Sequence, residues 1–216
     1  MTRGTKSVLF GAHCFLLHGW FVMVAWWSLY GFPWDPRLWV AFFTHDLGYW
    51  GKPDLDGSEG EKHVEFGARL MHWLFDRPFI KKGAEKCEWY DTYPGINCSE
   101  WKCPHCRTKW VSVEAPYCSC QLRFYWQDFC LYHSRFYAKR DGKLFSRLCV
   151  ADKLAIVLTP SWLYLPLARA SGELQEAMGL TTTRYAAMNL PSDDPREWHR
   201  NVKTYLRKWV EENKEK

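Results

Sequence analysis

The sequence predicts an all-α fold. Over most of the chain, apolar residues recur at the three- and four-residue spacing of amphipathic helices, and clusters of glycine and proline separate these stretches. Outside one cysteine-rich region, few segments show the apolar–polar alternation of strands. With 47% hydrophobic and 25% charged residues, the 216-residue chain has an ordinary globular composition and the length for a substantial core.

Three helices are predicted in the first part of the chain. Ser7 to Tyr30 contains no Asp, Glu, Lys or Arg and predicts one long apolar helix. Asp35 resembles an N-cap and Pro36 suits a first helical position, so Arg37 to Leu47 is predicted to follow as a second buried helix. After a loop of Gly, Pro and Asp, His63 to Phe75 carries an apolar stripe that predicts the third.

Helical patterning returns in the second part of the chain. It is present from Leu122 to Lys139 and from Leu144 to Leu158, where Pro160 ends it. Trp162 to Met178 and the segment from Pro195 to the end of the sequence predict further helices.

A region with a different residue pattern separates the two helical parts. Residues 85–121 lack helical periodicity and hold six of the nine cysteines. We therefore predict that residues 1–84 and 122–216 form one helical core, and that residues 85–121 are an insertion within it.

The charge of the chain suits an anionic small molecule. The net charge is +5 with a pI near 8.7, which is compatible with a phosphorylated substrate but too mild to predict duplex DNA binding. Many basic residues lie from Arg196 to Lys216 among several glutamates, a mixture typical of a solvated helix face.

The cysteines and the apolar N-terminal run bear on localisation. Nine cysteines are an odd number and no secretory signal is visible, which favours a cytoplasmic protein without a disulfide framework. Val8 to Tyr30 is long enough to span a bilayer, but it contains two histidines and two glycines and no second span follows. A buried central helix is the favoured interpretation, no membrane span is expected, and a homo-oligomer remains possible.

A His-Asp pair ends the second predicted helix. His45 and Asp46 follow the apolar run Trp39 to Phe43. Burying such a pair is costly unless a partner satisfies it, and a divalent cation does so because imidazole and carboxylate are both good ligands.

The surrounding pattern resembles the HD superfamily of metal-dependent phosphohydrolases. The resemblance rests on His18, on His45-Asp46 within Ala41 to Tyr49, and on Asp152 within Val150 to Leu154. It implies an HD-domain helical bundle in which these four side chains bind a metal ion. His13 competes with His18 for the first position, but the family spacing to Val22 favours His18.

Two further histidines imply a second metal by the same resemblance. His63 and His133 occupy the interval in which two-metal members of the superfamily carry additional histidines. Asp46 would then bridge the two ions. The resemblance implies one or two divalent metals, Fe, Mn, Mg or Ni, and does not choose among them.

Basic residues beside the predicted ligands are candidates for phosphate contacts. Lys153 follows Asp152, Arg135 follows His133 by two positions, and Lys52 lies in the loop after the His-Asp pair. Together with Asp46 they form the predicted catalytic set.

Three groups near this set carry open alternatives. The acidic loop Asp54 to Glu61 could cap the His63 helix, the favoured role, or supply Asp56 or Glu59 as a catalytic group. Trp162 and Tyr164 could stack on a base, although core packing is favoured for both.

The cysteine-rich insertion resembles a zinc ribbon or knuckle. Two pairs of cysteines, one with the spacing of a tight zinc-binding turn, predict a structural zinc site. The second pair is separated by one residue, so Cys98 or Cys87 could replace one of its members. The predicted ligands are Cys103, Cys106, Cys118 and Cys120.

Three functions are compatible with these features. The first is a phosphohydrolase acting on a nucleotide or another phosphate ester, favoured by Ala151-Asp152-Lys153 and the basic residues nearby. The second is a diiron oxygenase that cleaves a C–C or C–P bond with dioxygen, because its ligand set is nearly the same. The third is a catalytically silent module whose zinc insertion recruits nucleic acid or protein.

Overall fold

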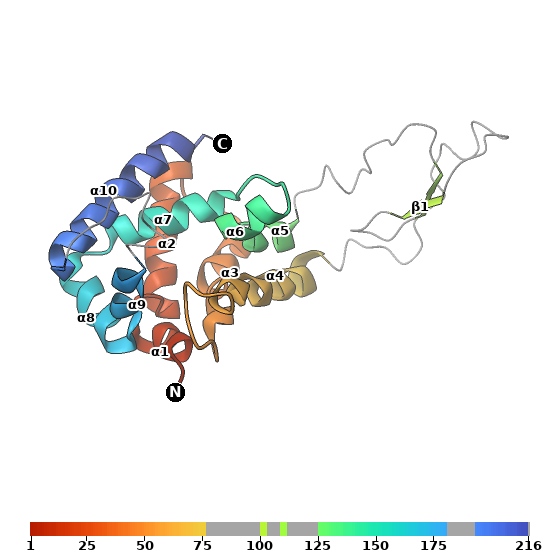
Figure 1. Ribbon diagram of the computed structural model, residues 1–216. Helices are drawn as coiled ribbons and strands as arrows, with labels where there is room; N and C mark the ends of the chain where they lie inside the picture. The colour runs from red at the N-terminus through yellow and green to blue at the C-terminus, as the bar shows by residue number, and fades with distance from the viewer. Residues whose placement is uncertain (77–99, 103–108, 112–124, 181–192, 216) are drawn as a thin grey trace.

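The fold is all-α in a computed structural model that describes residues 1–76, 100–102, 109–111, 125–180 and 193–215 (Figure 1). The α-helices are α1 (Arg3–Phe10), α2 (Phe15–Tyr30), α3 (Pro36–Thr44), α4 (Val64–Met71), α5 (Trp126–Leu131), α6 (Arg135–Arg140), α7 (Arg147–Leu158), α8 (Ser161–Ser171), α9 (Glu173–Gly179) and α10 (Pro195–Asn213). Shorter turns are the 3-10 helices η1 (Leu47–Tyr49) and η2 (Gly60–His63) and the π-helical turn η3 (His72–Asp76). The predicted fold class is confirmed.

Regular structure other than helix is confined, among the described residues, to one short hairpin. Strand β1 (Glu100–Lys102) pairs antiparallel with β2 (Lys109–Val111), and Trp101 is opposite Trp110 in the register. The hairpin falls within the predicted insertion. The four predicted zinc ligands lie outside the described residues, so the zinc site stays a prediction.

Helix α2 forms the centre of the core. It packs against α3 and crosses α7, and α10 in turn packs against α7 (Figure 1). Val22, Ala25, Phe42, Leu148 and Ala151 are completely enclosed where these helices meet. The small side chains at two of these positions let the helix axes approach closely.

The outer face of α2 is exposed. Leu16, Trp20 and Trp27 share this face at helical spacing, and each is more than half exposed. The prediction of a helix buried all round is therefore only partly correct. Among the described residues, no single helix is long and apolar enough to cross a bilayer; two bent pairs, α1–α2 and α7–α8, meet that test by length and composition.

The predicted single helix from Ser7 to Tyr30 is wrong, because the chain bends by 63° between α1 and α2. The bend depends on Glu173, whose carboxylate accepts a hydrogen bond from the backbone N–H of Ala12 at 2.9 Å. At Gly11, a Cβ atom would lie 2.2 Å from Glu173 Oε1. A continuous helix with a side chain here would collide with α9.

Glu173 also holds His13 in place. The buried carboxylate accepts from the Ser171 hydroxyl at 2.6 Å and pairs with His13 Nδ1 at 2.9 Å. Burial lowers the pKa of His13, but the Glu173 carboxylate outweighs it, and the pKa is raised to about 9. The start of α9 thus anchors the break between α1 and α2.

Two more predicted helices are divided. The segment from Leu122 to Lys139 forms α5 and α6, because Ser134 accepts hydrogen bonds from the backbone N–H groups of Phe136 and Tyr137 and caps a new helix. Trp162 to Met178 forms α8 and α9, separated by Gly172 at φ +86°.

The Glu173→Ala variant is expected to lower the free energy of unfolding by roughly 3 kcal/mol, because it empties a buried position and removes the acceptor of the Ala12 backbone N–H and the carboxylate partner of the partly buried His13. Glu211→Ala on the exposed face of α10 is the matched control and should change stability by less than about 0.5 kcal/mol. Urea denaturation checks both, and equal stabilities would contradict the anchoring role of Glu173.

Candidate metal centre

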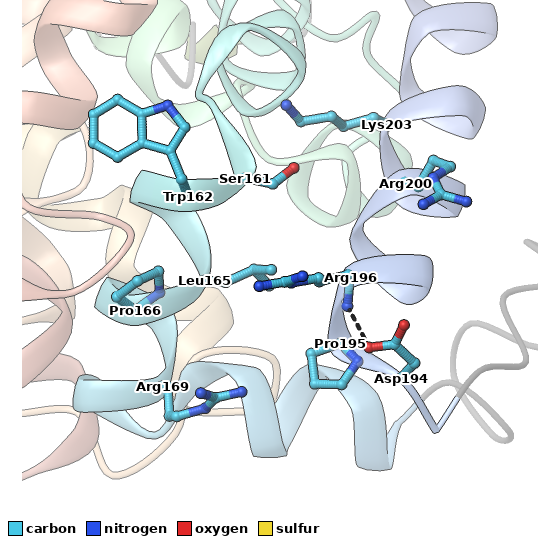
Figure 2. Close-up of a pocket in the computed structure, with 10 residues that line it drawn as sticks. All are labelled: Ser161, Trp162, Leu165, Pro166, Arg169, Asp194, Pro195, Arg196, Arg200 and Lys203. Atoms are coloured by element: carbon cyan, nitrogen blue, oxygen red, sulfur yellow. Dashed lines mark hydrogen bonds between the residues drawn. The ribbon is translucent and has the colours of Figure 1, made fainter.

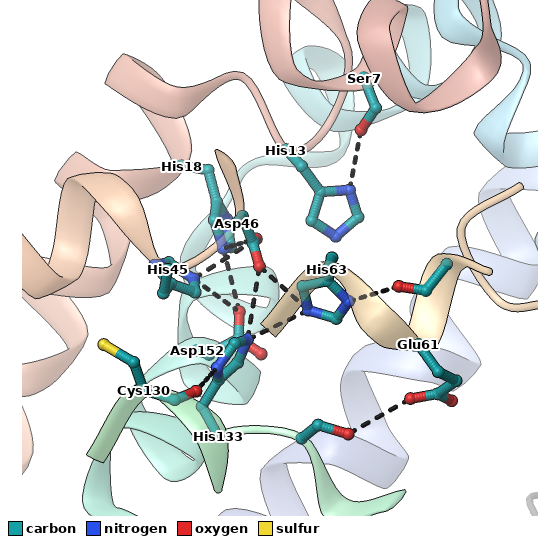
Figure 3. A network of polar contacts seen from close by, with 12 residues as sticks. Ser7, His13, His18, His45, Asp46, Glu61, His63, Cys130, His133 and Asp152 are labelled. Atoms are coloured by element: carbon teal, nitrogen blue, oxygen red, sulfur yellow. Dashed lines mark hydrogen bonds and ion pairs between the residues drawn. The ribbon is translucent and has the colours of Figure 1, made fainter. Parts of the chain in front are cut away.

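Six polar side chains converge in the core from separate segments of the chain (Figure 3). Each is less than 9% exposed although the surrounding helices are apolar. The helical interiors supply His18 on α2 and Asp152 on α7, whereas the other four residues lie at helix ends or turns. They are His45 and Asp46 after α3, His63 at the end of η2, and His133 between α5 and α6.

One group of four ligand atoms lies between α2, α3 and α7. His18 Nε2 is 3.0 Å from Asp152 Oδ1 and 3.3 Å from Asp46 Oδ2. His45 Nε2 is 3.4 Å from the same Asp46 oxygen. These four residues offer atoms within 4.8 Å of one another and could hold one metal ion.

A second group uses the other oxygen of Asp46. His63 Nε2 and His133 Nε2 are each 3.4 Å from Asp46 Oδ1 and 3.2 Å from each other. This group of three could hold another ion. Asp46 therefore belongs to both groups, with one carboxylate oxygen directed to each.

Three of the four histidines are oriented by the same local device. Nδ1 of His45 lies 3.0 Å from the carbonyl oxygen of Phe42, and Nδ1 of His63 lies 2.7 Å from that of Gly60. His133 Nδ1 makes the same contact with Cys130, again three residues earlier. A carbonyl only accepts, so each Nδ1 carries the proton and each Nε2 presents a lone pair to the centre.

This arrangement fits a cation. The lone pairs of His63 and His133 face one another and Asp46 Oδ1, and the buried His45 Nε2 has no hydrogen-bond partner. Acceptor atoms facing acceptor atoms in a buried site repel unless positive charge lies between them. The donor set of imidazole nitrogens and carboxylate oxygens is the one that divalent transition metals prefer.

The electrostatics of the centre support the same conclusion. Burial would raise the pKa of Asp46, but His45 and the neighbouring imidazoles hold it well below its usual range. Asp152 behaves similarly because Lys153 and His18 outweigh burial. Burial lowers the pKa of His45, yet the two carboxylates raise it overall, so the centre favours a positive charge at this point.

The surroundings contain two contacts that the sequence did not reveal. The ring of Tyr49 stacks on His63, with centroids 3.9 Å apart and an interplanar angle of 11°. Ser134, beside His133, donates to Glu61 at 3.2 Å. Tyr49 follows the His-Asp pair by three positions and Glu61 precedes His63 by two, which is the only signal that the sequence offers for either.

The structure places His13 beside the centre and outside both ligand groups. His13 lies in the break between α1 and α2, whereas His18 lies on α2. Its Nδ1 pairs with Glu173, and its ring meets that of His18 edge-on at 5.4 Å. It therefore supports His18 from the side.

The three predicted phosphate-binding cations lie in different places. Lys153 Nζ is 2.7 Å from Asp152 Oδ2, directly beside the centre. Arg135 covers the ring of Trp209 at 5.4 Å. Lys52 pairs with Glu59 at 3.5 Å in the loop.

The acidic loop caps the helical turn before His63, as the favoured interpretation had it. Asp54 Oδ1 accepts from the backbone N–H of Gly60 at 2.8 Å. Glu59 is exposed and pairs with Lys52 and Lys62. The backbone N–H of Asp56 donates to Glu176.

Comparison with known proteins returns no relative. The chain matches no protein-family model, no curated protein and no solved structure. A helical fold with a buried His/Asp cluster that could bind metal is compatible with an HD-type site.

The Asp46→Ala variant should lose metal from both ligand groups, because each group would lose its shared carboxylate oxygen. His63→Ala should affect only the second group. Metal content of purified protein reconstituted with iron or manganese, measured by inductively coupled plasma mass spectrometry, should fall to near zero in the first variant and by about one equivalent in the second. Full metal content in Asp46→Ala would refute the shared-ligand arrangement.

The Gly48→Ala variant should disturb the second group without touching a ligand. A Cβ atom at Gly48 would lie 1.9 Å from the backbone oxygen of His63, so the His63 segment must move. We expect the second metal equivalent to bind at least roughly tenfold more weakly. Gly179→Ala, whose Cβ would meet nothing within 4 Å, is the control and should bind metal normally.

Proposed function

We propose that this chain is a metal-dependent phosphohydrolase that cleaves a phosphate ester or anhydride of a nucleotide or a related small molecule. The observation that carries the proposal is the position of Asp46. Its two oxygens face two separate sets of ligand atoms, one containing His18 and His45 and the other containing His63 and His133. A carboxylate shared in this way is the arrangement expected for a pair of divalent ions.

Two close divalent ions, when bound, lower the pKa of a water molecule and hold phosphate oxygens in place. The protein's part is to fix the ligands. The i−3 carbonyl contacts of His45, His63 and His133 lock the imidazole orientations before any metal arrives, so little reorganisation is needed.

Lys153 is the residue best placed to contact an anionic substrate. Its ammonium group lies beside Asp152, and about a quarter of its side chain is exposed, so it reaches from the centre toward solvent. Arg135 adds positive charge nearby, and its charge acts to lower the pKa of Lys153. Positive groups at this edge favour a substrate whose negative charge increases during cleavage.

The resemblance to the HD superfamily supports the same proposal. The order of ligands along the chain, one histidine, a His-Asp pair, two further histidines and a late aspartate, is the one on which the resemblance rests. The alternative from that superfamily, a diiron oxygenase, uses nearly the same ligands. It becomes the favoured function if the experiment below detects no hydrolysis.

The decisive experiment is phosphate release from a panel of nucleotides, dinucleotides and simple phosphate esters, with manganese or iron supplied. Wild-type protein should release phosphate or a nucleotide product from at least one class, and Asp46→Ala should release none. Metal-loaded wild type that hydrolyses nothing but consumes oxygen with an organic substrate would replace the proposal by the oxygenase.

Lys153→Ala should lower kcat by about tenfold or more while the metal content stays at the wild-type level, because the variant removes a phosphate contact and no ligand. Lys139→Ala, which removes an exposed lysine on α6, is the matched control and should leave kcat unchanged. An unaltered kcat in Lys153→Ala would exclude this lysine from the site.

A further inference from the structure

A pocket lies between α8 and α10, and it has no residue in common with the candidate metal centre (Figure 2). Its volume is about 670 Å³, within the range on the order of 300–1,000 Å³ that is typical of small-molecule sites. One wall is the outer face of α8 and the other is the first part of α10. The lining residues are Ser161, Trp162, Leu165, Pro166, Arg169, Asp194, Pro195, Arg196, Arg200 and Lys203.

The pocket is strongly cationic. Arg169 enters from α8, and Arg196, Arg200 and Lys203 enter from α10. In the part of the chain that the structure describes, none of these four forms an ion pair with a carboxylate. The single acidic residue of the lining, Asp194, accepts a hydrogen bond from the backbone N–H of Arg196 and caps α10. Four cations on two helices, against one acidic residue in the lining, favour a multiply charged anion.

The walls of the pocket are fixed by contacts beneath them. Lys203 Nζ donates to the carbonyl oxygen of Thr159 at 2.6 Å, which ties α10 to the end of α7, just before α8 begins. His199 Nδ1 lies 3.0 Å from Ser161 Oγ, and the His199 ring stacks on Tyr164 at 4.3 Å. These contacts hold the part of α10 that carries Arg200 and Lys203 against α8, which lowers the entropic cost of binding.

An aromatic surface completes the pocket. Trp162 is 76% exposed at its rim, contrary to the prediction that it packs in the core. A large indole left in water on the edge of a cationic cavity offers a flat face to a planar ring. The second aromatic residue considered for stacking, Tyr164, is engaged with His199 instead.

We propose that this pocket binds a nucleoside polyphosphate, with its phosphate chain on the three arginines and Lys203 and its base on Trp162. The guanidinium fork matches phosphate oxygens in pairs, and several phosphate groups are needed to match four positive charges. A free monophosphate would leave most of that charge unmatched, and an acidic peptide would leave Trp162 unused. The site is additional to the proposed hydrolase centre and does not depend on it.

Isothermal titration calorimetry of the full chain with ATP, inorganic triphosphate and adenosine tests the proposal. ATP should bind most tightly, triphosphate more weakly and adenosine weakest. The Arg200→Gln and Arg169→Gln variants should each weaken ATP binding by roughly tenfold. Arg207→Gln, which removes the same charge from α10 outside the pocket, should change it by less than about twofold. An equal loss in Arg207→Gln, or no ATP binding by the wild type, would overturn the site.

The Trp162→Ala variant distinguishes the contribution of the base to ATP binding from that of the phosphates. It should weaken ATP binding several-fold and leave triphosphate binding unchanged, because only the nucleoside reaches the indole. Unchanged ATP affinity would overturn the nucleoside assignment.

Binding at the metal centre is distinguished by its own variants. ATP affinity at the pocket should persist in Asp46→Ala and in His63→Ala, with folding checked by thermal melting. Loss of ATP binding in both folded variants would assign the nucleotide to the metal centre and refute the pocket. If ATP binding persists in these variants and the wild-type protein hydrolyses none of the phosphate compounds, the pocket is retained and the proposed phosphohydrolase function is refuted.

Discussion

The burial of one carboxylate among four imidazoles is the constraint on which the rest of the structure depends. Asp46 lies in an apolar core, where His18 and His45 face one of its oxygens and His63 and His133 face the other, so that a cation held between these groups would offset its buried negative charge. Those four side chains come from α2, the end of α3, η2 and the turn after α5. Packing these elements around one point leaves little freedom in how the helices can be arranged. The geometry of the centre therefore restricts the geometry of the fold.

The interruptions in the helices serve this geometry. His45 and His133 lie where α3 and α5 stop, and His63 closes η2, so each ring can turn back onto a carbonyl that a continuing helix would have used itself. The bend at Gly11 brings His13 beside His18. The helix ends and the bend at Gly11 therefore orient the groups around Asp46.

Much of this was predictable from the sequence, and the remainder has a common cause. Helical periodicity locates most of the helices, and residue types in order locate all six members of the two ligand groups, because both signals are local or follow a known pattern. The bend at Gly11 was missed because it is imposed by Glu173, which is remote in sequence. The basic residues of α10 were interpreted as a solvated face because their apposition with Arg169 and Trp162 exists only in three dimensions.

The contact between the first bend and the start of α9 has an evolutionary consequence. Gly11 leaves the space that the Glu173 carboxylate fills, and His13 supplies the charge that this carboxylate pairs with. None of the three can change alone without leaving a clash, a void or an unpaired buried charge. In an alignment of relatives, positions 11, 13 and 173 should therefore be inherited together, and lineages that replace one should replace the others in the same step.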